Sequence, residues 1–431
     1  MNGSAAALAA RSDSRLGRQF GLLWAGQTVS NVGDRITLFV IPTLMIFAMG
    51  ASAFQVGLIS MAQYLAIPVL SLVAGVLADR WDLRRMLIAC DLVRFVAIAA
   101  IPVAYWQGFL SVPLLFCCVV VISAATVFFN IGYVPTLTVI VPRTELVRAN
   151  SRLETSRMAA EVGGPAIGSG LYRGLGVAAL VVDAATYLFS AVCLLAMRPT
   201  GAKPARTEGL RVRLMVGIRQ NWRDPVLRRC TAGTLLANIG GPIFVTQLPV
   251  LAYQGLGLSV GAFGTIMTVA AVGAVIGALV APAVSRRLGP ARVMSWAMPL
   301  HSLCGLGILL TAVAPAVVVL AATLTSYLFF FAWYNICSQS VRQARMPVAD
   351  QAVIYAAYRT VTWGVIPVSA FLGGVVVSLL AAHVDIRTAV TATMIGGTVI
   401  GLSAYLPLAP VQPMLDRAAA EEREGTADGR P

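Results

Sequence analysis

Four ionisable side chains lie deep inside long apolar runs: Asp34, Glu161, Asp183 and Arg359. A carboxylate at the centre of a membrane-spanning helix costs roughly 2.5–3.5 kcal/mol on insertion scales. Burial favours the neutral form of such a group and a nearby cation favours its charged form, so it can bind and release a proton as its surroundings change. The three carboxyl groups are therefore candidates for proton coupling, with Asp34 first, and Arg359 is a candidate internal counter-ion for proton or substrate coupling.

Asp34 lies near the middle of the apolar run 20–48. The alternative to proton chemistry is a structural ion pair with Arg35, but consecutive helical residues point about 100° apart and cannot face one partner squarely. Other polar residues inside the runs could line a cavity, or could instead form hydrogen bonds between packed helices. They are Asn31, Arg35, Asn130, Asn238, Gln247, Tyr334, Asn335 and Trp363.

The composition excludes most soluble classes of protein. Apolar and aromatic residues make up 58% of the 431 residues and charged residues only 12%, about half of the roughly 25% that is usual in soluble domains. The mean hydropathy is +0.81. A soluble fold of this length needs far more polar surface, which excludes soluble enzymes, disordered scaffolds and coiled coils.

The apolar runs predict an all-α membrane protein, because a bilayer-spanning helix needs about 20 largely apolar residues and lipid leaves no partner for open backbone groups. Twelve such runs predict twelve transmembrane helices in two pseudo-symmetric six-helix halves. The expected divisions are a cytoplasmic N-terminal segment 1–19, a first half 20–197, a cytoplasmic linker with an interfacial amphipathic helix 198–226, a second half 227–408 and a cytoplasmic tail 409–431.

The positive charges predict the orientation in the membrane. Of the 32 Lys and Arg residues, 27 lie before the first run, in every second loop with its adjoining helix ends, or in the tail. The alternate loops hold two, Arg173 and Arg387, and three lie inside runs. By the positive-inside rule, both termini are cytoplasmic and the protein is a multi-pass cell-membrane protein. The net charge of +14 therefore reflects topology, and we expect no nucleic-acid partner.

The chain repeats itself at an offset of 207 residues. Residues 31–87 align with 238–294 without a gap, pairing Asn31 with Asn238 and Pro42 with Pro249. Asp34 aligns with Gly241, so the second half lacks this carboxylate. Two parallel six-helix halves with a site near the midplane are typical of transporters.

Two sequence motifs in the chain resemble motifs of a known family. Residues 75–87, GVLADRWDLRRML, resemble the signature loop of the major facilitator superfamily, with Asp82 where Gly is usual and Leu83 where a basic residue is usual. The fitting positions are Gly75, Asp79, Arg80, Arg84 and Arg85. Residues 161–171, EVGGPAIGSGL, resemble the antiporter motif of exporters in that superfamily. Its positions are Gly164, Pro165, Gly168 and Gly170, with Ser169 in place of a Gly.

Each motif has two interpretations. The loop could be a cytoplasmic gate between the halves, with Asp79 facing an Arg or a helix N-terminus, or it could simply anchor the chain by positive charge. Asp91 and Arg94, spaced i, i+3 and assigned to the same gate region, are expected to pair with each other. The glycine motif could stiffen a kinked helix in an exporter, or could only permit close helix packing.

The resemblance, which extends to proteins like the enterobactin exporter and macrolide-efflux proteins, implies a secondary transporter and not an enzyme. No P-loop is present, so an ion gradient drives transport, and buried carboxylates favour protons. The expected function is proton-coupled export of a small amphipathic molecule, such as an antibiotic, siderophore or other secondary metabolite. Uptake of a nutrient and a non-transporting sensor are the alternatives. The seven cysteines lack metal-ligand spacing, so we expect no metal. We also expect no cofactor and a protein that functions as a monomer in the bilayer.

Overall fold

The computed structural model describes residues 17–142, 145–198, 210–346, 351–417 and 420. Within these ranges, nothing is described of some side chains, namely those of residues 71–80, 134, 135, 138, 147, 210–214, 216, 351–353 and 356.

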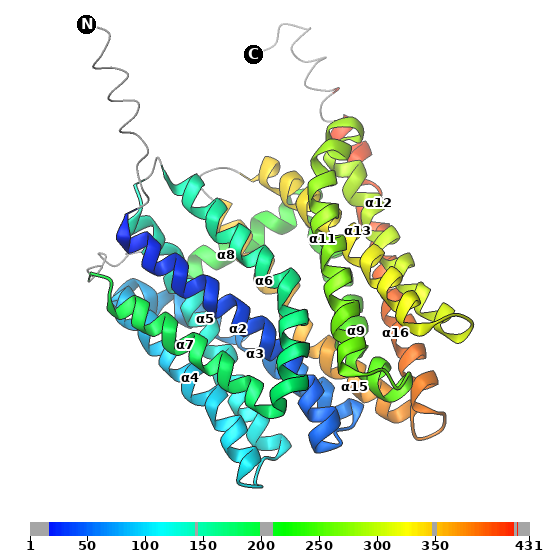
Figure 1. The fold of residues 1–431 in the computed structure, drawn as a ribbon. Coiled ribbons are helices and arrows are strands. Elements are labelled where there is room, and N and C mark those ends of the chain that lie inside the picture. The colour runs from blue at the N-terminus through cyan, green and yellow to red at the C-terminus, as the bar shows by residue number, and fades with distance from the viewer. Residues whose placement is uncertain (1–16, 143–144, 199–209, 347–350, 418–419, 421–431) are drawn as a thin grey trace, which may run out of the picture.

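Long helices make up nearly all of the described chain (Figure 1). The first half contains α2 (Arg18–Met49), α3 (Ala53–Arg80), α4 (Leu83–Trp106), α5 (Val112–Ile140), α6 (Leu146–Leu175) and α7 (Ala179–Leu195). The linker contributes α8 (Leu210–Arg223). The second half contains α9 (Pro225–Thr246), α10 (Leu248–Val250), α11 (Val260–Leu288), α12 (Pro290–Gly305), α13 (Ala316–Arg345), α14 (Gln351–Gly364), α15 (Ile366–Leu380), α16 (Ile386–Ser403) and α17 (Tyr405–Leu408).

The helices confirm the twelve-span prediction. Eleven segments of the described chain are long and apolar enough to cross a membrane. One of them, Arg148–Leu195, contains nearly all of α6 and the whole of α7, which are separated by the 3-10 turn Gly176–Ala178. The chain therefore crosses twelve times. Several spans also continue through a proline or a short turn, as α14 does into α15, which packed neighbours tolerate in membranes.

The two halves repeat the same helix neighbours. In the first half, α2 packs against α6 and α7, and α5 packs against α3 and α4. In the second half, α9 packs against α15 and α16, and α13 packs against α11 and α12. Between the halves, α3 packs against α15 and α6 against α11. The two inter-half pairs hold the two bundles side by side.

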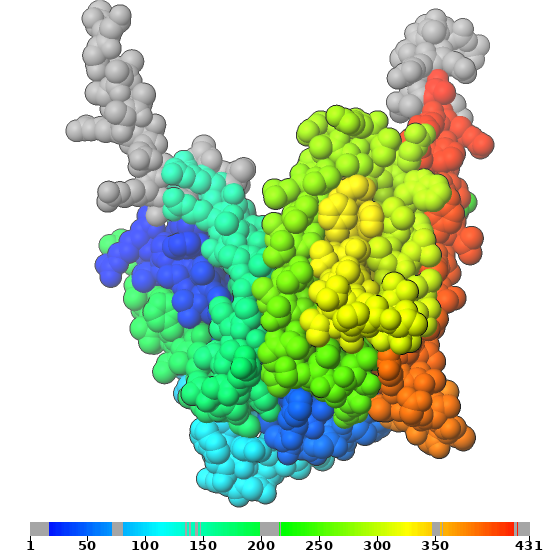
Figure 2. Space-filling model, turned by 45° about the vertical axis from the view of Figure 1, so that its right-hand side comes forward, coloured from blue at the N-terminus to red at the C-terminus, as the bar shows by residue number. Residues whose placement is uncertain are grey.

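The halves meet at one end and separate at the other. Near the α2–α3 turn, the Thr43 and Tyr253 hydroxyl oxygens are 3.0 Å apart, and Gln254 Nε2 donates to the Ala51 carbonyl at 3.0 Å. Phe54 and Phe371 place their ring centroids 5.5 Å apart. Toward the end at which α2 begins, a hollow separates the two halves, and we call this hollow the cleft (Figure 2). The structure is therefore closed at the α2–α3 turn and open at the opposite end.

Candidate functional site

A group of ionisable and polar residues, here called the acidic cluster, occupies the interior of the first half, between α2, α4 and α7. Asp34 comes from α2, Asp91 and Arg94 from α4, and Asp183 and Tyr187 from α7. Spacings of three residues in α4 and four in α7 place each pair on one face of its helix. Three carboxyl groups and one guanidinium group therefore share one region of the bundle.

Arg94 is the cation of this cluster. It forms an ion pair with Asp91, and both side chains are almost completely buried. Its guanidinium carbon lies 4.4 Å from the ring centroid of Phe129 and 4.5 Å from that of Tyr187, so the charge is also held between two aromatic faces. The Tyr187 hydroxyl donates to Asp34 Oδ1 at 2.6 Å. Tyr187 thus connects the buried ion pair to Asp34, which is only partly buried.

Asp183 is the most deeply buried carboxyl group of the cluster without an ion-pair partner among the described residues. It is 0% exposed, and the Thr37 hydroxyl donates to one of its carboxyl oxygens. The Thr186 hydroxyl lies 3.0 Å from the other carboxyl oxygen and 2.7 Å from the Asp183 backbone carbonyl, so it shares its hydrogen between the two. No Lys or Arg of the described chain forms an ion pair with it. An uncompensated buried carboxylate is costly, and a bound proton removes the charge.

Gly33 makes room for this arrangement. A Cβ atom at position 33 would overlap Asp183 Oδ1 and Thr186 Oγ1, and would lie 3.1 Å from Asp183 Cγ. Only glycine allows α2 to approach α7 closely enough for Thr37 to reach Asp183. The residue before Asp34 therefore helps to determine the geometry of the acidic cluster.

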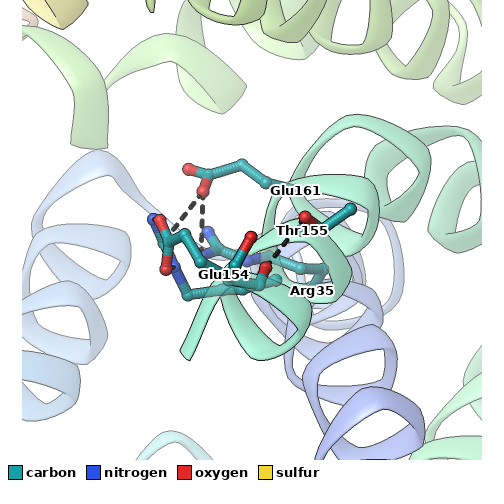
Figure 3. Close-up of polar contacts among 6 residues, drawn as sticks. Arg35, Glu154, Thr155 and Glu161 are labelled. Carbon is teal, nitrogen blue, oxygen red and sulfur yellow. Dashed lines mark hydrogen bonds and ion pairs between the residues drawn. The ribbon is translucent and has the colours of Figure 1, made fainter. Parts of the chain in front are cut away.

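A second ionic group lies between α2 and α6 (Figure 3). Arg35 Nη2 is 3.5 Å from Glu161 Oε2, and Arg157 Nη1 is 3.1 Å from the same oxygen. Arg157 also pairs with Glu154 at 2.6 Å. The Arg35 and Glu161 side chains are 29% and 41% exposed, so water screens this group. Asp34 and Arg35 do not pair with each other, in line with the argument from helix geometry, because Arg35 contacts Glu161 of α6 and Asp34 contacts Tyr187 of α7.

The glycine motif places α6 between the two halves. A Cβ atom on Gly164 would overlap Arg35 Cβ, and one on Gly168 would lie 3.2 Å from Phe39 Cβ, so this face packs tightly on α2. Ser169 fills the space beside Gly264 of α11 in the other half. Pro165 lies within the helix, and a Cβ atom on Gly170 would have no neighbour within 4 Å. Close packing accounts for Gly164 and Gly168, and Gly170 has no such contact.

The α3–α4 loop stabilises helix ends. Asp82 caps α4 by accepting from the Arg85 backbone N–H at 2.9 Å, which accounts for an acidic residue where the family has glycine. Leu83 is 2% exposed in the core. Arg84 donates to the Leu194 carbonyl at 2.8 Å and to that of Leu195, which caps the C-terminus of α7.

The remaining gate residues can be placed only partly. Arg85 is exposed. Gly75, Asp79 and Arg80 belong to α3, but their side chains lie outside the described residues, so the gate remains a prediction.

The predicted cavity residues are scattered over different environments. Arg359 is exposed, and its guanidinium carbon lies 4.2 Å from the Trp363 ring centroid. Asn238 donates to the Thr362 carbonyl at 2.7 Å, as expected of a packing hydrogen bond. Gln247 and Tyr334 are fully enclosed and do not line an open cavity in this conformation. Asn31 is partly buried, whereas Asn130 and Asn335 are exposed.

Sequence reasoning missed three hydroxyl groups of the cluster, those of Thr37, Thr186 and Tyr187. A signal was present, since Thr37 lies three residues after Asp34, and Thr186 and Tyr187 lie three and four residues after Asp183. It also missed Arg157 as the i−4 partner of Glu161. Among the described residues, no group of three or more His, Cys, Asp and Glu side chains could hold a metal ion.

Twelve membrane-spanning helices in two repeated halves, with a cleft between them, define a membrane transport protein. The chain belongs to the Major Facilitator Superfamily, whose family model matches residues 23–370. It is a transporter and not an enzyme.

Known proteins of this kind resemble the chain in sequence and in fold. The uncharacterized MFS-type transporter YfiS of Bacillus subtilis (strain 168) is 26% identical over 181 residues, 40% of each chain. The multidrug efflux pump Tap of Mycolicibacterium fortuitum is 26% identical over 230 residues, 50% of this chain and 55% of Tap. The match therefore spans about half the length of these relatives or less. The crystal structure of the nucleoside transporter NupG has a TM-score of 0.69 at 13% identity, over 91% of this chain and 98% of NupG, which shows the shared fold.

Proposed function

We propose that this protein is a proton-coupled exporter of small amphipathic molecules, such as antibiotics or other secondary metabolites. In this proposal it works as a monomer in the cell membrane with both termini in the cytoplasm, and protons moving inward drive the substrate outward.

The observation that carries the proposal is the acidic cluster of α2, α4 and α7. Asp91 is neutralised by Arg94, but Asp183 has only hydroxyl partners and Asp34 has the Tyr187 hydroxyl. If all three carboxyl groups were ionised, the cluster would carry two uncompensated negative charges in the interior of the bundle. Binding one or two protons removes this cost, so the cluster is suited to carry protons.

The coupling follows from the position of Asp34 at the exposed end of this cluster. In the conformation described here, the proton leaves Asp34 toward the open cleft, and the Tyr187 hydroxyl stabilises the resulting carboxylate. Reprotonation from the other side, once the cleft faces outward, removes the charge and allows the return step. The neighbouring Arg35–Glu161 pair joins α2 to α6, and α6 contacts the second half. A change at Asp34 can therefore reach the interface between the halves.

Two features support export as the direction. The glycine motif of α6 packs closely between α2 and α11, and in this proposal the close packing limits leakage during export. The relative Tap is a multidrug efflux pump, although the match spans about half of each chain. Together they favour outward transport of amphipathic compounds.

Membrane vesicles of inverted orientation test both direction and energy source. We expect that respiration-driven uptake of at least one compound, from a panel of amphipathic dyes and antibiotics, requires this protein and stops when nigericin dissipates the pH gradient. Uptake that depends on sodium, or that persists without a pH gradient, would contradict the proposal.

A reporter fused after Pro410 tests the orientation in the membrane. We expect the reporter to be active in the cytoplasm, and activity outside the cell would contradict the proposed orientation.

A further inference from the structure

The linker helix α8 has one buried and one exposed face. Gly217 and Asn221 are buried. On the opposite side, Met215 is 64% and Trp222 48% exposed, and Arg219 and Arg223 are also exposed. These four residues are spaced i, i+4, i+7 and i+8, so they form one stripe along the helix. We call this stripe of Met215, Arg219, Trp222 and Arg223 the α8 face.

The buried side fixes α8 to the second half. Asn221 Nδ2 donates to the Ile354 carbonyl of α14 at 2.8 Å. Asp224, the residue after α8, caps α9 by accepting from the Val226 backbone N–H at 2.8 Å, and it pairs with Arg345 of α13 at 2.9 Å. The helix is thus held on the ends of α9, α13 and α14. Its exposed face has a defined orientation and is not the surface of a loose linker.

The position of the α8 face indicates what lies against it. The span α9 begins at Pro225, two residues after Arg223, so the end of α8 lies at a boundary of the bilayer. Tryptophan favours the headgroup region, and the long apolar part of an arginine side chain can lie along acyl chains while its charge reaches phosphate. The sequence of α8 contains no acidic residue. The face therefore combines apolar contact with unopposed positive charge, as in amphipathic helices that bind anionic membranes.

We propose that the α8 face is a docking surface for anionic phospholipid headgroups, of the phosphatidylglycerol type, on the side of the membrane to which the cleft opens. The two arginines contact the phosphate groups, and Met215 and Trp222 insert between the headgroups. A zwitterionic phospholipid offers the same apolar contact without net charge and binds more weakly. The inference does not depend on which substrate is transported.

Thermal unfolding of the purified full-length protein, titrated with phosphatidylglycerol or phosphatidylcholine in mixed micelles, tests the proposal. We expect phosphatidylglycerol to raise the melting temperature at a lower lipid fraction than phosphatidylcholine does. In the Arg219→Gln/Arg223→Gln variant, the apparent affinity for phosphatidylglycerol should fall about five-fold per arginine, with little change for phosphatidylcholine. Trp222→Gln should weaken the binding of both lipids.

The matched control is Arg219→Lys/Arg223→Lys, which keeps both charges and should retain most of the preference for phosphatidylglycerol. The proposal is overturned if the double glutamine variant keeps the full preference. It is also overturned if sn-glycerol 3-phosphate produces the same rise in melting temperature, because the face would then bind a soluble phosphate. Size-exclusion chromatography of each variant shows whether it remains folded.

Discussion

Replacing Gly33 by alanine would test whether the acidic cluster depends on the close approach of α2 and α7. The added methyl group would overlap Asp183 Oδ1 and Thr186 Oγ1. To relieve the overlap, α2 must move from α7 or the Asp183 side chain must change its rotamer. Either change weakens the bonds from Thr37 and Thr186 to Asp183, and movement of α2 also weakens the bond from Tyr187 to Asp34.

The expected cost follows from these contacts. Overpacking a tight interior typically costs about 1–3 kcal/mol, and a weakened hydrogen bond to an ionised group costs about 1.5–3 kcal/mol. Because these terms overlap, we expect Gly33→Ala to destabilise the protein by about 2–4 kcal/mol. For a chain of 431 residues, that loss corresponds to a fall in melting temperature of roughly 2–4 °C. Proton-driven transport in vesicles should fall more steeply than the amount of folded protein.

The same helix offers a matched control, because a Cβ atom on Gly21 would have no neighbour within 4 Å. Gly21→Ala should leave stability unchanged, or raise it by up to about 1 kcal/mol through better helix propensity. If Gly33→Ala and Gly21→Ala have the same melting temperature and the same transport rate, the close contact at Gly33 does not organise the cluster.

Three further predictions concern single contacts. Arg84→Gln should lower the free energy of unfolding by about 1–2 kcal/mol, because the α7 carbonyls of Leu194 and Leu195 lose a charged donor. The control is the exposed Arg85→Gln, which should stay within about 0.5 kcal/mol of the wild type. Equal melting temperatures for the two variants would contradict the capping role of Arg84. Tyr187→Phe keeps an aromatic ring against Arg94 but removes the hydroxyl that donates to Asp34. Expression should therefore be normal, whereas uphill transport in vesicles should be several-fold slower. A wild-type transport rate would exclude a role for this hydrogen bond. A double-mutant cycle of Arg35→Gln and Glu161→Gln, measured by thermal unfolding, should give a coupling energy below about 1 kcal/mol, because water screens this partly exposed pair. A coupling energy above about 2 kcal/mol would contradict this and would show that the pair is shielded from water.

The number and type of the helices could be predicted from the sequence, because runs of apolar residues of bilayer length leave the backbone little alternative to helix. The family signature was also readable in residues 75–87 and 161–171. What the sequence could not supply was the partner of each ionisable group. Asp34 and Arg35 are neighbours in the chain, yet their side chains contact different helices, α7 and α6.

The candidate site was predicted unevenly for the same reason. The Asp91–Arg94 contact is local, so helical spacing alone indicated it. The contacts of Asp183 with Thr37 and of Tyr187 with Asp34 join residues about 150 positions apart, and depend on Gly33 allowing two helices to approach. Polar residues such as Gln247 and Tyr334 look similar in sequence to cavity residues, but tertiary packing encloses them.

The central claim is that Asp34 and Asp183 carry the transported proton, and substrate-driven proton movement in proteoliposomes tests it most directly. The vesicles contain a pH-sensitive dye, and the compound that the vesicle panel shows to be transported fastest is applied as a gradient. For the wild-type protein we predict proton counter-flow that stops when the compound is removed. Asp34→Asn and Asp183→Asn should abolish the proton flow while exchange of the compound across the membrane partly survives. Proton counter-flow at the wild-type rate in both variants would contradict the claim, and would direct attention to Glu161.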